Sequence, residues 1–249
     1  MTIFAYGAKE LSALELAISP ERLQPYIIRA GGNRHGAILV YERNTALSEA
    51  LYGVIQATEI ALRNAIHRVL SVPHSQMWFE SVGLQGTQLE KITAAKYEIC
   101  RSRRALTPGA VIAELNLGFW TSLVSTRYEK QLWVPHLHKA FPYALKPTPA
   151  RPTAPSSPLS RAEIFDRLEI VRNLRNRIAH HEPILKLDLP RVYAGALEAI
   201  SWVCPTSADW VRATNSFPRR FHEKPLAYAA PKLPSAAPTP KPGMPTPKT

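Results

Sequence analysis

Residues 44–70 read NTALSEALYGVIQATEIALRNAIHRVL, and they form the longest helical pattern in the chain. Mostly apolar residues recur in this stretch every three or four positions, which is the period of a helix with one face in a core. They are Leu47, Leu51, Val54, Thr58, Ala61, Leu62, Ala65 and Val69. Asn44 is of a residue type that caps helices well, so we expect a helix from Asn44 to about Leu70.

Helical periods recur on both sides of this stretch, whereas few segments alternate with the period of two that marks a strand. On the N-terminal side we expect helices over 9–17 and 20–30, with Ser19 as the cap of the second and Gly31 and Gly32 at its end. On the C-terminal side the expected helices are 88–100, 108–116, two short helices around Trp120 and Trp133, one that starts near Ser160 and ends before Pro183, 189–203 and 207–213. The chain is therefore predicted to be all-α.

Helix boundaries and core residues after position 100 follow from two further patterns. Thr107 followed by Pro108 is a cap and first-position pair, and Gly118 is expected to interrupt the helix that they begin. Aromatic residues at helical spacing are more often core than a surface for stacking bases. Trp120 and Trp133 are therefore predicted to be buried.

The composition sets the domain organisation. The chain has 249 residues, of which 45% are hydrophobic, enough for one sizeable core, so we predict a single helical domain over residues 1–223. Within it, residues 142–160 are too rich in proline for helix or sheet and are expected to form a long disordered loop. Residues 224–249 consist mostly of Pro, Ala, Lys and Thr and are predicted to be a disordered tail.

Charge and cysteine usage narrow the class of protein. The net charge of +12 and the pI near 9.9 are typical of chains that bind nucleic acid or another anionic surface. Cys100 and Cys204 stand far apart, which predicts reduced thiols instead of a disulfide framework or a zinc site. The sequence has neither a run of about eighteen apolar residues nor a signal-like N-terminus. We therefore predict a soluble, cytoplasmic protein without a membrane partner.

The helical pattern that starts near Ser160 has an arginine at a position expected to be apolar. At about 100° per residue its apolar residues fall on one face, namely Ile164, Leu168, Val171, Leu174 and Ile178. Arg175 falls in the middle of that face. Burying an unpaired charge costs several kcal/mol, so Arg175 requires an anion, a set of carbonyl groups or a partner subunit.

The residues that follow, RNRIAHHEPI over 175–184, combine groups suited to cutting RNA. RNA carries a 2′-hydroxyl, and its attack on the adjacent phosphate needs a proton carrier and a fixed cation instead of a metal. His180 can act as general base or acid, and Arg175 can stabilise charge on the phosphoryl oxygens. Asn176 would orient a phosphate oxygen or the histidine, and His181 would be a second proton carrier or a capping residue.

Arg175, Asn176 and His180 resemble the Arg-x4-His signature of HEPN-domain ribonucleases, and the fuller string resembles the bacterial abortive-infection (Abi)-like proteins of that superfamily. Three other segments are similar to recurrent parts of the same family: SPERLQPYI at 19–27, ERNTALSEALYGVIQATEIALRN at 42–64 and LGFWTSLVSTRYEKQLW at 117–133. The resemblance spans residues 10 to about 185, and the long loop at 142–160 departs from it.

The resemblance implies a HEPN-like helical bundle with an extra N-terminal helical region. It also implies a homodimer, in which two copies of the motif face each other, and an endoribonuclease without metal or cofactor. Such an enzyme would act on RNA in phage defence or in a toxin–antitoxin system, under the control of an antitoxin or a regulatory RNA.

The resemblance implies that other polar and charged residues support the active site or bind RNA, whereas without it they would be ordinary surface residues. On the long helix, Glu59, Arg63 and Asn64 would support the site, although Glu59 and Arg63 also have the spacing of a surface ion pair. His67 is expected to be a surface histidine. The cationic residues Arg172, Arg177 and His181 would bind RNA, or they would form a solvated face favoured by the helix dipole.

The sequence lacks the motifs of several other enzyme classes, namely a Gly-rich phosphate loop, a serine nucleophile elbow, a His-Glu-x-x-His motif and paired acids for divalent metals. Two functions remain. The first function is a metal-independent endoribonuclease. The second is a non-catalytic RNA-binding or protein-interaction module that uses the same basic helix, and His180 separates the two because only catalysis requires its proton.

Overall fold

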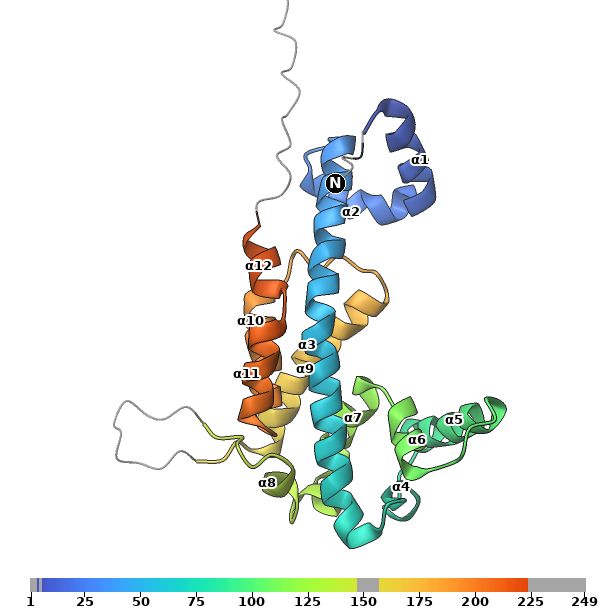
Figure 1. Ribbon diagram of the computed structural model, residues 1–249, viewed down its shortest axis with the longest axis vertical. Helices are drawn as coiled ribbons and strands as arrows, with labels where there is room; N and C mark the ends of the chain where they lie inside the picture. The colour runs from blue at the N-terminus through green and yellow to red at the C-terminus, as the bar shows by residue number, and fades with distance from the viewer. Residues whose placement is uncertain (1–3, 5, 147–156, 224–249) are drawn as a thin grey trace, which may run out of the picture. The chain divides into compact units, whose positions relative to one another are not determined.

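The computed structural model describes residues 4, 6–146 and 157–223, and the predicted tail at 224–249 lies outside them (Figure 1). Within the described residues the chain is helical and has no strand, so the all-α prediction is confirmed. Residues up to Val40 belong to one compact unit, and Tyr41–Glu223 form a second. Each unit is described separately.

The first unit contains the two short helices that the sequence predicts. They are α1, Ala8–Ile18, and α2, Pro20–Arg29. The Ser19 hydroxyl accepts a hydrogen bond from the Arg22 N–H at 3.3 Å, which confirms Ser19 as the cap of α2. Gly31 and Gly32 follow with φ angles of 63° and 85°, a conformation that glycine adopts at little cost.

The long helix α3, Arg34–His74, begins well before the predicted start. Asn33 lies at this start, since its side chain accepts a hydrogen bond from the Gly36 N–H at 2.7 Å. Once a first turn is formed, adding residues to a helix is easy, so α3 continues through residues 34–43 without a break. The prediction that Asn44 caps the helix is wrong, and Asn44 instead lies inside α3 with 5% of its surface exposed.

The middle of the second unit is a series of short elements rich in buried aromatic residues. They are α4 (Trp78–Ser81), α5 (Thr87–Arg101), α6 (Pro108–Glu114), α7 (Leu117–Leu123), the 3-10 turn η1 (Thr126–Tyr128), the π-turn η2 (Glu129–Trp133) and α8 (Leu137–Ala140). Trp120 and Trp133 are 0% and 1% exposed, as predicted. Their indole N–H groups donate to the carbonyls of Leu115 and Leu123 at 3.1 and 2.6 Å. Both tryptophans therefore fix the path of the chain around α7.

The start of α6 confirms one boundary prediction, and the start of α7 corrects another. The Thr107 hydroxyl accepts from the Ala110 N–H at 3.1 Å, as expected of a cap. The chain then breaks at Leu115 and Asn116, and Asn116 caps α7 by accepting from the Phe119 N–H at 3.1 Å. Gly118 lies within α7 and is not the interruption, because the Asn116 cap supplies the break two residues earlier.

The ends of the proline-rich segment are paired instead of disordered. Leu145 and Pro158 form an antiparallel bridge. The Lys146 N–H donates to the Ser157 carbonyl, and the Leu159 N–H donates to the Ala144 carbonyl, each at 2.8 Å. For 142–146 and 157–160 the predicted disorder is therefore wrong, whereas residues 147–156 lie outside the described part of the chain.

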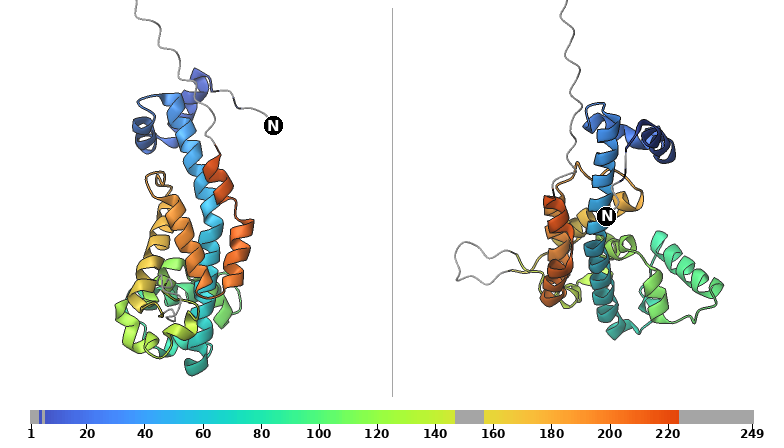
Figure 2. Two further views of the ribbon diagram at one scale, coloured as in Figure 1. Left: turned by 90° about the vertical axis from the view of Figure 1, so that its left-hand side faces the viewer. Right: turned by 45° about the horizontal axis from the view of Figure 1, so that its top comes forward.

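Four helices complete the second unit: α9 (Arg161–Ala179), α10 (Leu189–Ser201), α11 (Pro205–Thr214) and α12 (Phe217–His222). α10 packs against both α9 and α11 (Figures 1 and 2). In Figure 1 and in the right-hand view of Figure 2, α11 and α5 lie on opposite sides of the part of α3 that belongs to this unit. Apolar side chains of α3, α7, α9 and α10 share one hydrophobic core, which holds α9 in place.

Helix α9 begins with a capping box that should make stability depend on pH. The Ser160 N–H and hydroxyl each donate to the Glu163 carboxylate at 2.8 Å, and these bonds, with Lys146 nearby, lower the pKa of Glu163 to about 2. Because the folded state prefers the ionised carboxylate, this stabilisation is complete above about pH 4.5 and is lost as the pH falls through about 2.

Glu163→Gln should therefore lower the free energy of unfolding near neutral pH, and the gap from the parent should shrink on acidification. Urea titrations at pH 7 and pH 3 measure both gaps. Asp166→Asn, an exposed change on the same helix, is the control for the loss of one negative charge. A gap that stayed constant between the two pH values would contradict the role of the Glu163 carboxylate.

Two further observations concern the described residues as a whole. None of their helices combines the length and the apolar character that crossing a membrane requires. Cys100 is exposed and Cys204 is half-buried, and both are free thiols.

Candidate functional site

The RNRIAHHEPI segment lies where α9 ends. The last helical residue is Ala179, and the His180 N–H donates to the Asn176 carbonyl at 2.9 Å. The Glu182 N–H donates to the Arg177 carbonyl at 2.8 Å, and His181 has a φ angle of 56°. These features define a Schellman ending, in which glycine commonly takes the left-handed position. The helix thus ends before Pro183, as the sequence suggests, and both histidines are exposed.

His181 holds this left-handed position at an energetic cost. A residue with a Cβ is strained there by about 1–2 kcal/mol, and glycine is not. Strain of this kind clusters at functional sites, and among the described residues Ser19, Ser75 and Arg103 have positive φ angles as well. Of the two roles considered for His181, the structure places it at the capping position, where its side chain also lines a groove described below.

Arg175 and Asn176 are half-buried. Within residues 4, 6–146 and 157–223 no hydrogen bond or ion pair is formed by the side chain of Arg175, Asn176 or His180. Arg175 lies on the apolar stripe as predicted, yet the core ends with Leu174 and leaves Ile178 only partly covered. This helix end therefore presents a guanidinium, an amide and an imidazole that can bind a ligand.

The neighbouring arginines are paired locally. The Arg172 Nε donates to Glu169 at 2.7 Å. Arg177 donates to the Pro183 carbonyl at 3.3 Å and forms an ion pair with Glu182 at 3.5 Å. Both contacts of Arg177 are with residues just after α9, so its side chain is part of the helix ending.

The three supporting candidates on α3 do not form one cluster. Glu59 accepts a hydrogen bond from the Leu117 N–H at 2.7 Å and so fixes the first turn of α7. The Nε atom of Arg63 is buried and has no hydrogen-bond partner among the described residues. Asn64 is exposed and lines a separate groove of about 570 Å³ with Trp210 of α11.

Glu59 and Arg172 both lie close to the first turn of α7. A Cβ atom added to Gly118 in the first turn of α7 would lie 3.9 Å from the Cδ atom of Arg172. The expected Glu59–Arg63 ion pair is not among the ion pairs of the described residues, because Glu59 instead binds a backbone N–H of α7. Glu59 therefore fixes the start of α7.

His67 corrects another prediction. It is half-buried instead of lying on the surface, and the Trp78 indole N–H donates to its Nδ1 atom at 3.0 Å. Burial lowers its pKa. His67 thus acts as a structural acceptor for a core tryptophan.

Asn44 anchors the segment that follows the two histidines. Its Oδ1 atom accepts a hydrogen bond from the Ile184 N–H at 2.8 Å, and both residues are buried. Buried backbone N–H groups require a partner. This bond therefore ties the motif segment to the middle of α3.

A groove of about 460 Å³ lies beside this anchor. It is lined from α3 and from the end of α9 by Tyr41, Asn44, Thr45, Ser48, Glu49, Tyr52, Ile178, Ala179 and His181. Its size is within the roughly 300–1,000 Å³ of typical ligand sites. Sequence reasoning missed it, although Tyr41, Thr45, Ser48 and Tyr52 recur at helical spacing on one face of α3.

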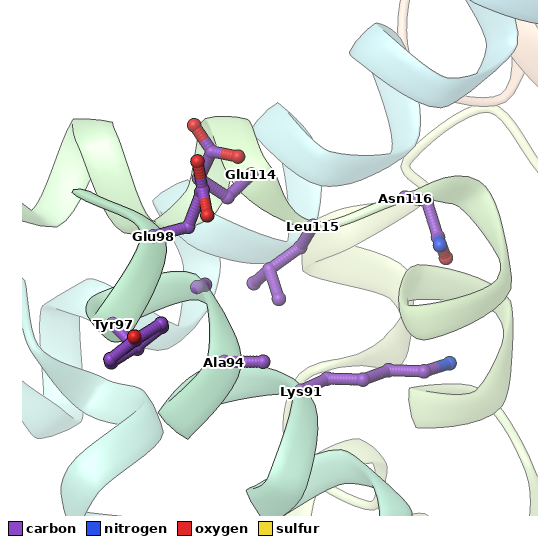
Figure 3. A pocket seen from close by; sticks show the side chains of 8 residues that line it. Lys91, Ala94, Tyr97, Glu98, Glu114, Leu115 and Asn116 are labelled. Carbon is purple, nitrogen blue, oxygen red and sulfur yellow. The ribbon is translucent and has the colours of Figure 1, made fainter. Parts of the chain in front are cut away.

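Lys91 of α5 is a further candidate that the sequence does not reveal. It is half-buried, and its pKa is lowered by burial and by the charge of Arg172. Figure 3 shows its side chain extending toward Asn116, in a cavity of about 390 Å³. Arg172 on α9 thus affects the pKa of Lys91 on α5.

Comparison of the chain with protein-family models, with curated proteins and with solved structures gives no match. No group of three or more His, Cys, Asp or Glu side chains among the described residues is placed to hold a metal ion. A function for this chain therefore has to be argued from the helix end and its surroundings.

Proposed function

We propose that this chain is a metal-independent endoribonuclease of the Abi-like group within the HEPN superfamily. One observation carries the proposal: Arg175, Asn176 and the exposed His180 stand together at the end of α9 without partners among the described residues. The strained position of His181 and the net charge of +12 support it. The role in phage defence or in a toxin–antitoxin system rests on the sequence resemblance.

In this proposal His180 removes the proton from a 2′-hydroxyl of RNA. The 2′-oxygen then forms a bond to the adjacent phosphorus, and the bond from phosphorus to the 5′-oxygen breaks. Arg175 stabilises the charge on the phosphoryl oxygens, and Asn176 orients one of them. The leaving oxygen takes a proton from His181 or from a histidine of a second copy, and the products are a 2′,3′-cyclic phosphate and a 5′-hydroxyl.

A second copy of the chain is part of the proposal. Arg175 and His180 are separated by about 7.5 Å along the axis of an ideal helix and by about 140° around it, so one motif alone makes an incomplete site. Arg175 and Ile178 leave the end of the apolar stripe partly open, and a facing copy would cover it. A monomeric mass in solution under assay conditions would contradict this homodimer.

Incubation of the protein with total cellular RNA in excess EDTA tests the function. We expect fragments on a denaturing gel, and mapping of their ends should give 2′,3′-cyclic phosphates and 5′-hydroxyls. Fragments with 5′-phosphates, or cleavage that EDTA abolishes, would contradict the proposed chemistry.

The alternative is a non-catalytic RNA-binding module. It is favoured by the neighbouring cations Lys91 and Arg172, since Arg172 precedes His180 by two turns of α9 and could hold a phosphate without cutting. Salt-sensitive RNA binding without cleavage, in the presence and absence of phage infection extracts, would support this function.

A further inference from the structure

The groove of about 460 Å³ beside Asn44 differs in charge from the chain as a whole, which has a net charge of +12. The described residues that line it include no lysine or arginine, and Glu49 contributes a carboxylate. Phosphates of RNA are bound mainly where Lys and Arg neutralise them. A phosphate is therefore a poor occupant of this groove, and an uncharged group fits it better.

Asn44 supplies one fixed hydrogen-bond donor to the groove. Its Oδ1 atom accepts from the Ile184 N–H, so the other side of the amide is the Nδ2 amino group. Only 5% of Asn44 is exposed, yet among the described residues its Nδ2 atom forms no hydrogen bond. Polar groups at this depth are normally paired. Because Asn44 lines the groove, an acceptor atom of an occupant can supply the missing partner.

The other polar groups along this part of α3 are acceptors. The Thr45 hydroxyl donates its proton to the Tyr41 carbonyl at 3.2 Å. The Ser48 hydroxyl donates to the Asn44 carbonyl at 2.8 Å, so both oxygens have only lone pairs left to offer. Glu49 is exposed, and within the described part of the chain its carboxylate has no hydrogen bond or ion pair. An occupant that matches these groups carries N–H donors as well as an acceptor for Asn44.

An exposed aromatic ring lies in the same groove. Tyr52 lines it, and 59% of this residue is exposed. Proteins that recognise single-stranded RNA stack unpaired bases on such rings and form hydrogen bonds to the edges of the bases. Cytosine, adenine and guanine carry an exocyclic amino group, whereas uracil presents a carbonyl oxygen in its place. A base with an amino group therefore matches both the ring and the acceptors.

The groove adjoins the proposed cleavage site, because His181 lines it and directly follows His180. We propose that the groove binds an unpaired RNA base with an exocyclic amino group, in a nucleotide next to the phosphate that is cut. The amino group donates to Glu49, an acceptor atom of the base binds the Nδ2 atom of Asn44, and the ring stacks on Tyr52. This inference rests on the proposed function and names the feature of the RNA that the site selects.

Binding of a short 2′-O-methyl oligocytidylate and of an oligouridylate of the same length to the full chain tests the inference. Neither probe can be cut by 2′-oxygen attack, and both carry the same charge. They differ in the bases, where cytosine has an amino group and uracil a carbonyl. We expect the parent to bind the cytidine probe about five- to tenfold more tightly, the effect of one net hydrogen bond. In Glu49→Ala the two affinities should differ by less than about twofold, because the acceptor is lost.

Tyr52→Ala should weaken the binding of both probes by about tenfold or more, since a stacking ring contributes at least that much for each base. The matched control is Tyr97→Ala, because Tyr97 is an exposed tyrosine on α5 and does not line the groove. Glu90→Ala, an exposed change on α5, is the control for the loss of one negative charge and should keep the preference for cytidine.

Equal affinity of the parent for the two probes, or a full preference for cytidine in Glu49→Ala, would overturn the inference. Equal losses in Tyr52→Ala and Tyr97→Ala, or no measurable binding by the parent, would also overturn it. A lower molecular mass in solution for Tyr52→Ala than for the parent would do so as well, because a second copy would then occupy the groove.

Cleavage of RNA in EDTA is measured separately on the parent. Cleavage without a preference between the probes would remove this inference and leave the endoribonuclease proposal in place. A preference for cytidine that Glu49→Ala abolishes, found without any cleavage, would instead keep the base site and assign it to the non-catalytic RNA-binding module.

Discussion

Replacing His180 with alanine should reduce RNA cleavage by about 10²–10⁴-fold, the usual contribution of a general acid or base. The fold should not change, because His180 is exposed at the cap of α9 and its side chain has no bond within the described residues. Its backbone N–H, which donates to Asn176, is retained in alanine. Initial rates on a fluorescent RNA and thermal unfolding of the same samples measure the two effects.

Arg175→Ala should produce a loss of about 10²–10³-fold, since it removes a donor to the developing oxyanion. Arg175→Lys should recover only part of the rate, because an ammonium lacks the planar fork of the guanidinium.

The matched control for His180→Ala is His138→Ala, because His138 is an exposed histidine on α8. Parent-like cleavage by His180→Ala would exclude His180 as the proton carrier, and equal loss in His138→Ala would point to a non-specific effect of removing histidines.

Asn44→Leu should destabilise the second unit by about 1–3 kcal/mol. Leucine is similar in size, but it leaves the buried Ile184 N–H without an acceptor. Cleavage should fall as well, because the bond fixes the segment that follows His181. Urea titration gives the stability, and initial rates at a temperature where the variant is fully folded give the activity.

Asn64→Leu is the control for stability, since Asn64 is exposed on the same helix and changes at such positions are usually within about 0.5 kcal/mol. Stability equal to that of the parent in Asn44→Leu would show that the Ile184 N–H finds another acceptor. A stable but inactive variant would instead assign Asn44 to the positioning of the motif.

Local chemistry explains why several boundaries could be predicted. Ser19 and Thr107 act within three residues of themselves, as a cap does, and the end of α9 is signalled by Pro183. Asn44 belongs to the same class of capping residues, but its partner Ile184 is 140 positions away. Such a partner cannot be deduced from the neighbouring sequence, so the start of α3 was misplaced.

The site shows the same limit. Arg175, Asn176 and His180 lie within six consecutive residues, and their placement at a helix end follows from the sequence. Glu59 was expected to pair with Arg63 four residues later, and it binds Leu117, 58 residues away. Lys91 has no local signature, since only the fold brings α5 within reach of the charge of Arg172.

The paired ends of the proline-rich segment have a practical consequence. Ala144 and Lys146 are hydrogen-bonded to Leu159 and Ser157, so the chain is already closed on itself before α9 begins. The entropy of closing a loop grows only slowly with its length, by about 0.6 kcal/mol for each doubling. A reporter domain or an affinity tag inserted between Lys146 and Ser157 would leave α9 and its capping box in place. Both ends of the chain would then stay unmodified in tests of the proposed homodimer.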